Sequence, residues 1–388
     1  MKMQLKKFRR VLCALTFGLA MTTAVGCSSA TKNTDMDTTL LPLSTEEQTE
    51  KILASMSLPE KVGQMVMIGI NETTATDDNL FMLHQYHIGG IILFDKNMQN
   101  PEQVKELTAT LQREAGEKVP LFFAVDEEGG LVARMKDKLP PPPSAAEVGA
   151  SGDFHLAGNL AEDISKKLLA MGFNINFAPV ADLGTERGRS YSTDPAIATK
   201  HIQSAAAGYE KEGMLYCLKH FPGIGKGTVD THIDSAVVDS SLKELEADDL
   251  IPFQTIIKEK NPADYFVMVS HVTYPQLDSG CPASLSKVIQ TDVLRDKLGY
   301  KGVIITDSVS MGALSKHYSY REIGVKAVKA GADIVLINHD YPYETDLYLG
   351  MLDAAEKGEI STERINESVR RILNVKLKHL AAKNTNKK

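Results

Sequence analysis

A glycine-rich stretch from Lys219 to His232 carries the side chains best suited to acid–base chemistry. It reads Lys-His-Phe-Pro-Gly-Ile-Gly-Lys-Gly-Thr-Val-Asp-Thr-His. Asp230 lies two residues before His232, so its carboxylate can hydrogen-bond the imidazole, orient it and support its protonated form. Such a pair can act as a general acid and base, and glycine and proline allow the tight path that places it over a site. A solvated loop with an incidental histidine is the alternative.

Ionisable residues also stand where apolar, strand-like runs end. Five of eight such runs end in them, namely at Asp126, Asp182, Lys219 with His220, His271, and Asp307. One aspartate after a strand is commonly a helix cap. Five ends of this kind instead predict a polar site at one end of a sheet.

Metal, nucleotide and nucleic-acid chemistry have less support. His220, Asp230, His232 and Asp234 are candidate metal ligands, but no His-Glu-x-x-His or cysteine-pair spacing occurs. We therefore expect neither a metal nor a cofactor. The stretch from Gly223 to Thr228 lacks the phosphate-loop spacing, and no Gly-x-Gly-x-x-Gly follows the first strand. The net charge of −7, without a basic stripe beyond the N-terminus, argues against a nucleic-acid partner.

The elements that must position these residues alternate between strand and helix. Continuous apolar runs predict strands buried on both faces, at Met65–Ile70, Gly90–Phe94, Leu121–Asp126, Ile175–Asp182, Met214–His220, Tyr265–His271, Val303–Asp307 and Asp333–Asn338. Helical patterns lie between them, at Pro101–Gly116, Leu156–Met171, Ala196–Glu212, Leu242–Lys258, Ser286–Leu298 and Tyr320–Ala330. Eight such repeats predict an α/β fold, a single (β/α)₈ barrel of the TIM type, with an open doubly wound sheet as the alternative.

The N-terminus resembles a targeting segment rather than part of the fold. Basic residues precede an uncharged run from Val11 to Val25, and Ala24-Val25-Gly26-Cys27 resembles a bacterial lipobox. We expect residues 1–26 to be a lipoprotein signal peptide, Cys27 to carry the lipid, and residues 27–44 to form a polar tether. The protein would then be anchored to a bacterial cell membrane, facing the extracytoplasmic side, with residues 45–388 as its barrel domain. An ordinary secretory signal is the alternative.

Two further patterns concern the ends of the barrel and its cysteines. Ser44 followed by Glu47 is a capping box that predicts a helix to about Met56, and residues 364–380 form an amphipathic helix. Cys217 lies in an apolar run and is expected to be a buried thiol. Whether it pairs with Cys281 is open, because spacing alone does not establish disulfide geometry.

Several ordered motifs together resemble family 3 glycoside hydrolases, specifically their bacterial β-N-acetylhexosaminidase branch. The stretch from Lys219 to His232 is similar to the branch's loop motif, with Ile224 where His is frequent and Thr231 where Ser is commoner. The segment Val-Asp-Glu-Glu-Gly-Gly at 125–130 resembles Val-Asp-Gln-Glu-Gly-Gly. Other similar segments cover residues 174–182, 189–195, 270–272, 282–286 and 302–312.

The resemblance implies a role for each matched residue. Asp307 would be the nucleophile and His232 the general acid/base, with Asp230 as its hydrogen-bond partner. The terminal sugar would be held by Asp126, Arg134, Arg189, Lys219 and His220, with Arg134 assigned through its spacing from Asp126. The family often has a second arginine where this chain has Leu131, so one outer contact is expected to be missing.

The implied activity is that of a retaining exo-β-N-acetylglucosaminidase, without a cofactor, whose partner is a GlcNAc-containing glycan such as a peptidoglycan fragment. A family 3 β-glucosidase or β-xylosidase is an alternative, but those enzymes usually take their acid/base from outside the barrel. Phosphorolysis is a further alternative, since a histidine does not repel phosphate as a carboxylate would. A sugar-binding lipoprotein without catalysis is the alternative from another class.

Overall fold

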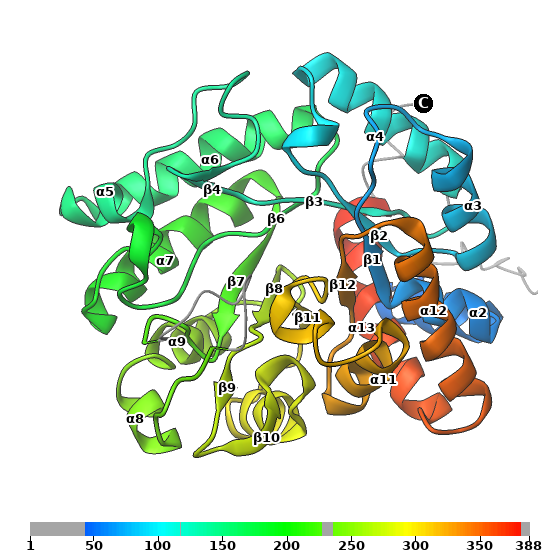
Figure 1. Ribbon diagram of the computed structural model, residues 1–388. Helices are drawn as coiled ribbons and strands as arrows, with labels where there is room; N and C mark the ends of the chain where they lie inside the picture. The colour runs from blue at the N-terminus through cyan, green and yellow to red at the C-terminus, as the bar shows by residue number, and fades with distance from the viewer. Residues whose placement is uncertain (1–42, 117, 227–235, 382–388) are drawn as a thin grey trace, which may run out of the picture. The chain divides into compact units, whose positions relative to one another are not determined.

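The computed structural model describes residues 43–116, 118–226 and 236–381. Eight parallel strands follow one another around a closed sheet (Figure 1). They are β1 (Val66–Ile68), β2 (Gly90–Ile92), β3 (Phe122–Val125), β6 (Ile175–Asn176), β7 (Leu215–Phe221), β8 (Tyr265–Val269), β11 (Val303–Thr306) and β12 (Val335–Ile337). Val66 pairs with Val335, and a parallel bridge between Ile305 and Ile334 joins the two remaining edges. The predicted (β/α)₈ barrel is confirmed.

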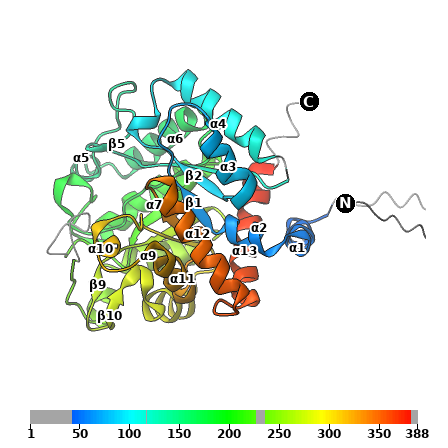
Figure 2. The ribbon, with the colours of Figure 1, turned by 45° about the vertical axis from the view of Figure 1, so that its right-hand side comes forward.

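Helices cover the outside of the barrel, as both ribbon views show (Figures 1 and 2). They are α1 (Thr45–Ser55), α2 (Leu58–Gln64), α3 (Asp77–Tyr86), α4 (Pro101–Ala115), α5 (Ala145–Ala150), α6 (Phe154–Ala170), α7 (Pro195–Glu212), α8 (Leu242–Ala247), α9 (Ile251–Glu259), α10 (Gly312–Ser315), α11 (Tyr320–Ala330), α12 (Tyr341–Glu356) and α13 (Thr362–Lys376). Their apolar stripes pack on strands that are buried along their whole length. None of the described helices is long and apolar enough to cross a membrane.

The predicted elements agree with the structure except where proline or polar residues intervene. The predicted helix 242–258 is divided into α8 and α9, because Pro252 suits a first helical turn and not a helix interior. The predicted strand 175–182 ends at Asn176, and Val180 then forms only an isolated bridge to Lys219. Residues 288–297 form a π-helix within the predicted helix 286–298. The capping box at Ser44 and Glu47 is confirmed by its two reciprocal hydrogen bonds.

Two short hairpins depart from the barrel pattern. One joins β4 (Glu127–Gly129) to β5 (Val132–Ala133), directly after barrel strand β3, and the other joins β9 (Thr273–Tyr274) to β10 (Asp278–Pro282). The turn of the first contains Gly129 at φ +98°. A side chain there would meet the Pro143 carbonyl at 2.4 Å, so glycine lets the proline segment lie against the hairpin.

Buried polar contacts fasten the N-terminal end of the barrel. Asp333, just before β12, accepts hydrogen bonds from Arg295, Arg371 and Ser368. These partners tie the strand to α13 and to the π-helix, and their positive charges hold the pKa of Asp333 below its usual range despite burial. The cluster lies at the opposite end of β12 from the candidate site.

Candidate active site

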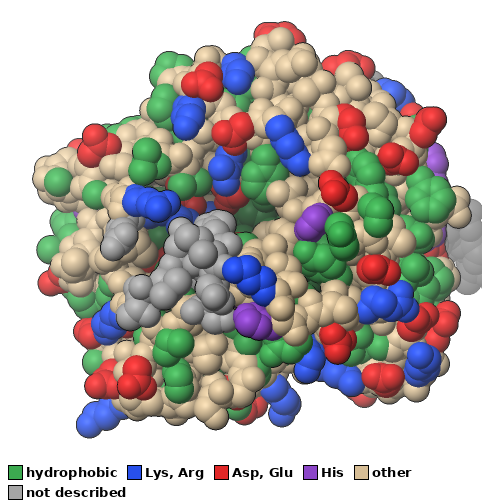
Figure 3. Space-filling view, in the orientation of Figure 1, with side chains coloured by type: hydrophobic (Ala, Val, Ile, Leu, Met, Phe, Trp, Pro, Cys, Tyr) green, Lys and Arg blue, Asp and Glu red, His purple; other side chains and the backbone are tan. Residues whose placement is uncertain are grey.

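A pocket of about 240 Å³ opens at the C-terminal ends of the barrel strands. Its described lining includes Asp126, Arg134, Arg189, Lys219, His220 and Asp307, six of the residues predicted from the sequence. The space-filling view shows a hollow near the centre of this face with basic side chains around it (Figure 3). Ligand pockets for drug-sized molecules begin at about 300 Å³, so this one suits a single small ring.

Asp126 and Glu128 both face the pocket because side chains alternate along an extended chain. Lys219, on β7, lies between them, with Nζ 2.7 Å from Asp126 Oδ1 and 2.6 Å from Glu128 Oε1. Only 2% of the Lys219 side chain is exposed. Burial opposes its charge, but the two carboxylates outweigh burial and raise the pKa of Lys219. The ammonium therefore stays charged and holds both acids in place.

Arg189 completes this network from the loop after β6. Its Nε and Nη2 each donate to Glu128 at 2.8 Å, a bidentate pair. Burial opposes ionisation of Glu128, but Lys219 and Arg189 overcome it and lower the pKa of Glu128 to about 2. Arg134, on the first hairpin, lies 3.5 Å from Asp126 and stacks over the Phe94 ring. Charged donors and acceptors of this kind are suited to holding sugar hydroxyls.

His220 is oriented from below by Asp182. Its Nδ1 lies 2.7 Å from Asp182 Oδ2, and its backbone N–H donates to Asp182 Oδ1 at 3.1 Å. The Asp182 side chain is fully buried. The ring edge that carries Nε2 faces Arg189, at 3.5 Å from Nη2.

Asp307 follows β11 on the opposite side of the pocket. Its Oδ1 accepts a hydrogen bond from the Ser308 N–H at 2.7 Å. Burial opposes ionisation of Asp307, but positive charge on His220 and His271, with the Ser308 N–H, keeps its pKa below the usual value. His271 also holds the Ser308 carbonyl at 2.9 Å from Nε2. The carboxylate is thus kept ionised, as a nucleophile requires.

Three of the predicted functional residues, Asp230, His232 and Cys27, lie outside the described residues. Their roles stay predictions. Cys217 is buried as expected, with a raised pKa caused by burial, and both it and Cys281 are free thiols. Within the described ranges, no three His, Cys, Asp or Glu side chains are grouped so as to hold a metal ion.

Glu128 is a central residue of the site to which the sequence reasoning gave no role. The sequence does carry a signal for this role. Glu128 lies two residues after Asp126 on an extended segment, and this separation places both side chains on one face. Asp182 and His271 were noted at strand ends without a role. The structure assigns them the orientation of His220 and of the backbone beside Asp307.

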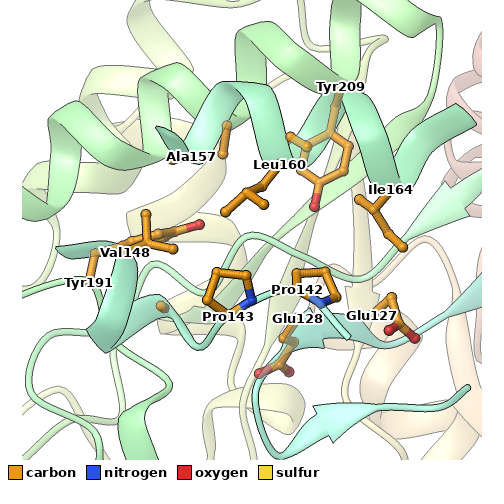
Figure 4. Close-up of a pocket in the computed structure, with 13 residues that line it drawn as sticks. Glu127, Glu128, Pro142, Pro143, Val148, Ala157, Leu160, Ile164, Tyr191 and Tyr209 are labelled. Atoms are coloured by element: carbon orange, nitrogen blue, oxygen red, sulfur yellow. The ribbon is translucent and has the colours of Figure 1, made fainter. Parts of the chain in front are cut away.

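A second, smaller cavity lies behind the hairpin and does not fit a sugar. It measures about 30 Å³ and is lined by Glu127, Glu128, Pro142, Pro143, Tyr191 and residues of α5, α6 and α7 (Figure 4). That volume has room for about one or two water molecules. Glu127 points here rather than into the pocket, because it alternates with Asp126 and Glu128.

Comparison with known proteins identifies the family. The model of the glycosyl hydrolase family 3 N-terminal domain matches residues 57–375. A beta-hexosaminidase of Nitrosomonas eutropha is 33% identical over 286 residues, which cover 71% of this chain and 80% of that protein. Beta-hexosaminidase A of Pseudoalteromonas piscicida is 34% identical over 337 residues, covering 79% of this chain. The chain spans only 56% of that longer relative.

Solved structures show the same relationship. A family 3 β-N-acetylglucosaminidase from Paenibacillus sp. superposes with a TM-score of 0.80 at 37% identity, over 84% of this chain and 64% of that one. A β-N-acetylhexosaminidase from Beutenbergia cavernae superposes with a TM-score of 0.75 at 28% identity, over 83% of this chain and 99% of that one. The match over most of the barrel, together with the carboxylate and basic residues of its pocket, shows that this chain belongs to glycoside hydrolase family 3.

Proposed function

We propose that the chain is a retaining exo-β-N-acetylglucosaminidase that removes terminal β-linked GlcNAc from peptidoglycan fragments or related glycans. The observation that carries the proposal is the position of Asp307 across one small pocket from Lys219, Arg189 and Arg134. Relatives named for β-N-acetylhexosaminidase activity support this choice of sugar. The dimensions of the pocket favour a single terminal sugar over the interior of a chain.

In the proposed reaction, the sugar hydroxyls bind to Asp126, Lys219 and the arginines, and the anomeric carbon faces Asp307. The Ser308 N–H donates a hydrogen bond to Oδ1 of Asp307, so Oδ2 is the oxygen that attacks that carbon. The glycosidic C–O bond breaks as the new ester bond forms, and the leaving oxygen takes a proton from His232. Water then attacks the anomeric carbon and gives a proton to His232, the bond from that carbon to Asp307 breaks, and the sugar leaves with its original configuration.

The second half of the proposal concerns location. Cys27 would be lipidated after removal of residues 1–26, and residues 27–44 would tether the barrel to the outer face of a bacterial cell membrane. The lipobox-like sequence before Cys27 supports this. Globomycin, which blocks lipoprotein signal cleavage, should make a larger precursor accumulate. Cys27→Ala should accumulate as the same larger precursor, because lipoprotein signal cleavage requires the lipidated cysteine; a Cys27→Ala protein that is still processed to the mature size would contradict the anchor.

The activity is tested by comparing 4-nitrophenyl β-N-acetylglucosaminide with 4-nitrophenyl β-glucoside on the purified protein. We expect release of nitrophenol from the first substrate and little from the second. Preference for the glucoside would place the enzyme among the family 3 glucosidases. Tight binding of GlcNAc without turnover of either substrate would indicate a sugar-binding protein.

A further inference from the structure

A buried aspartate that the proposed reaction does not use lies beside the start of the glycine-rich stretch. Asp249 stands between α8 and α9, and only 1% of its side chain is exposed. Its Oδ2 lies 2.9 Å from Lys226 Nζ, and Lys226 is the one cation paired with Asp249 among the described residues. A buried charge is costly to leave without a partner. The ion pair therefore ties the Lys226 side chain to the body of the barrel.

The backbone just before Lys226 is held by buried side chains as well. Gly223, at φ +126°, lies directly against Asp249, and a Cβ there would come within 2.7 Å of the Asp249 Cβ. The Gly223 carbonyl accepts a hydrogen bond from the buried Tyr274 hydroxyl at 2.7 Å. The Ile224 N–H donates to Asp182 Oδ1 at 2.9 Å. Three buried side chains from different parts of the chain thus fix this path.

The path leads from the pocket toward the residues assigned to acid–base chemistry. Ile224 lines the pocket, and Lys226 follows it by two residues. Lys226 directly precedes residues 227–235, which contain Asp230 and His232 and lie outside the described residues. The ion pair of Lys226 therefore determines the point from which the segment with the acid/base begins.

The two flanks of residues 227–235 are held in different ways. After this segment, backbone hydrogen bonds join the chain to β9: the Thr273 N–H donates to the Ala236 carbonyl at 2.9 Å, and the Val238 N–H donates to the Thr273 carbonyl at 3.0 Å. Before it, the backbone hydrogen bonds of the described residues stop at Ile224. The side chain of Lys226 is the last polar contact on that flank, so the N-terminal flank depends on Asp249.

We propose that Asp249 is a positioning residue for the general acid/base, and that it acts through Lys226 on the place where His232 meets the leaving oxygen. The inference rests on the proposed function and adds a residue that touches neither the substrate nor the reacting atoms. A proton donor must lie within hydrogen-bond reach of the oxygen that it protonates. A displacement of about 1 Å is enough to lower the rate strongly.

Asp248 offers a matched control on the same lysine. Its Oδ2 lies 3.2 Å from Lys226 Nζ, but its side chain is 50% exposed. Water screens an exposed pair, so it holds the lysine weakly. Asp248→Asn should therefore behave as the wild type, whereas Asp249→Asn removes the buried partner without changing the shape of the side chain.

The test compares kcat/KM for phenyl and 2,4-dinitrophenyl β-N-acetylglucosaminide. Phenolate is a strong base that needs a proton as it leaves, whereas dinitrophenolate leaves without one. In Asp249→Asn we expect the phenyl value to fall about tenfold, part of the roughly hundredfold or more that a general acid contributes. The dinitrophenyl value should not change. Lys226→Gln should give the same pattern, and the double variant should lose no more than either single variant.

His232→Ala is the reference, because it removes the acid itself and should lower only the phenyl value. A selective loss in His232→Ala with equal losses on both substrates in Asp249→Asn, or with none, would overturn the positioning role and leave the proposed function intact. A tenfold loss in Asp248→Asn would also overturn it. A wild-type protein that cleaves neither substrate would overturn the proposed function, and the role of Asp249 with it.

Discussion

Asp182 and His220 form a buried pair, with His220 Nδ1 2.7 Å from Asp182 Oδ2, and the pair lies beneath the pocket that contains Asp307. The aspartate side chain is fully buried. A buried carboxylate of this kind fixes the orientation of the ring. The pair therefore influences how easily Asp307 stays ionised, since positive charge on His220 lowers the pKa of Asp307.

Asp182→Asn should shift the acid limb of the activity profile to higher pH. The amide preserves the shape of the side chain but replaces the carboxylate that His220 Nδ1 contacts with a neutral group. Positive charge on His220 lowers the pKa of Asp307, so a change that weakens this charge raises the pKa of Asp307 and a higher pH is needed to ionise the nucleophile. The measurement is kcat/KM against pH for both proteins. An unchanged acid limb would show that His220 does not control Asp307.

Glu128→Gln should destabilise the fold and also weaken substrate binding. The change leaves buried Lys219 with one carboxylate and Arg189 without its bidentate partner. Breaking a buried ion pair from one side costs about 3–5 kcal/mol. We expect the free energy of unfolding in urea to fall by about that amount.

The matched control is Glu162→Gln on α6. Glu162 pairs with Lys211 at 2.7 Å, but the lysine side chain is 64% exposed. An exposed pair contributes about 0–1 kcal/mol, so this variant should remain close to the wild type. Equal losses of unfolding free energy in the two variants would contradict the claim that burial makes the Glu128 ion pairs more stabilising than the Glu162 pair.

Glu127→Gln should remove part of the pH dependence of stability. Glu127 is 5% exposed, and burial raises its pKa from 4.5 to about 7. Hydrogen bonds from the Arg134 and Met135 amides lower this pKa, but burial outweighs them. Between those pH values the folded protein holds a proton that the unfolded chain has released. The wild type therefore loses about 3 kcal/mol of stability as the pH rises from about 4.5 to 7.

Glutamine keeps an oxygen that accepts the Arg134 N–H and has no proton to lose, so this contribution should vanish. The measurement is the difference in unfolding free energy between the two proteins from pH 4.5 to 8. Taking the difference cancels the parallel contribution of Glu344, whose pKa burial raises to about 8. Parallel curves for both proteins would show that Glu127 is ionised throughout.

The barrel was predictable because its strands are apolar on both faces. Seven of the eight strands lie within the predicted runs, and β7 extends one residue beyond its run, to Phe221; the residues after two strand ends, Asp126 and Asp307, line one pocket. The β4–β5 hairpin was missed because Glu127, Glu128 and two glycines give it no apolar pattern. Its conformation depends instead on contacts such as the hydrogen bond from the Gly130 N–H to the Pro142 carbonyl.

The charge network was less predictable, because its partners lie far apart in the sequence. Glu128 and Arg189 are separated by 61 residues, and nothing local distinguishes Glu128 from Glu127. Only the alternation of side chains along the hairpin separates the acid that binds Lys219 from the acid that is buried behind it. The roles of Asp230 and His232 continue to rest on the sequence pattern.

The most direct test of the central claim is azide rescue of Asp307→Ala with 4-nitrophenyl β-N-acetylglucosaminide. Removing the nucleophile should lower kcat at least about a thousandfold. Azide can then enter the space left by the carboxylate and attack from the same side. We expect it to restore nitrophenol release with the α-glycosyl azide as product, identified by NMR. Formation of the β-azide, or near-normal activity of the variant without azide, would contradict the assignment of Asp307 as the nucleophile.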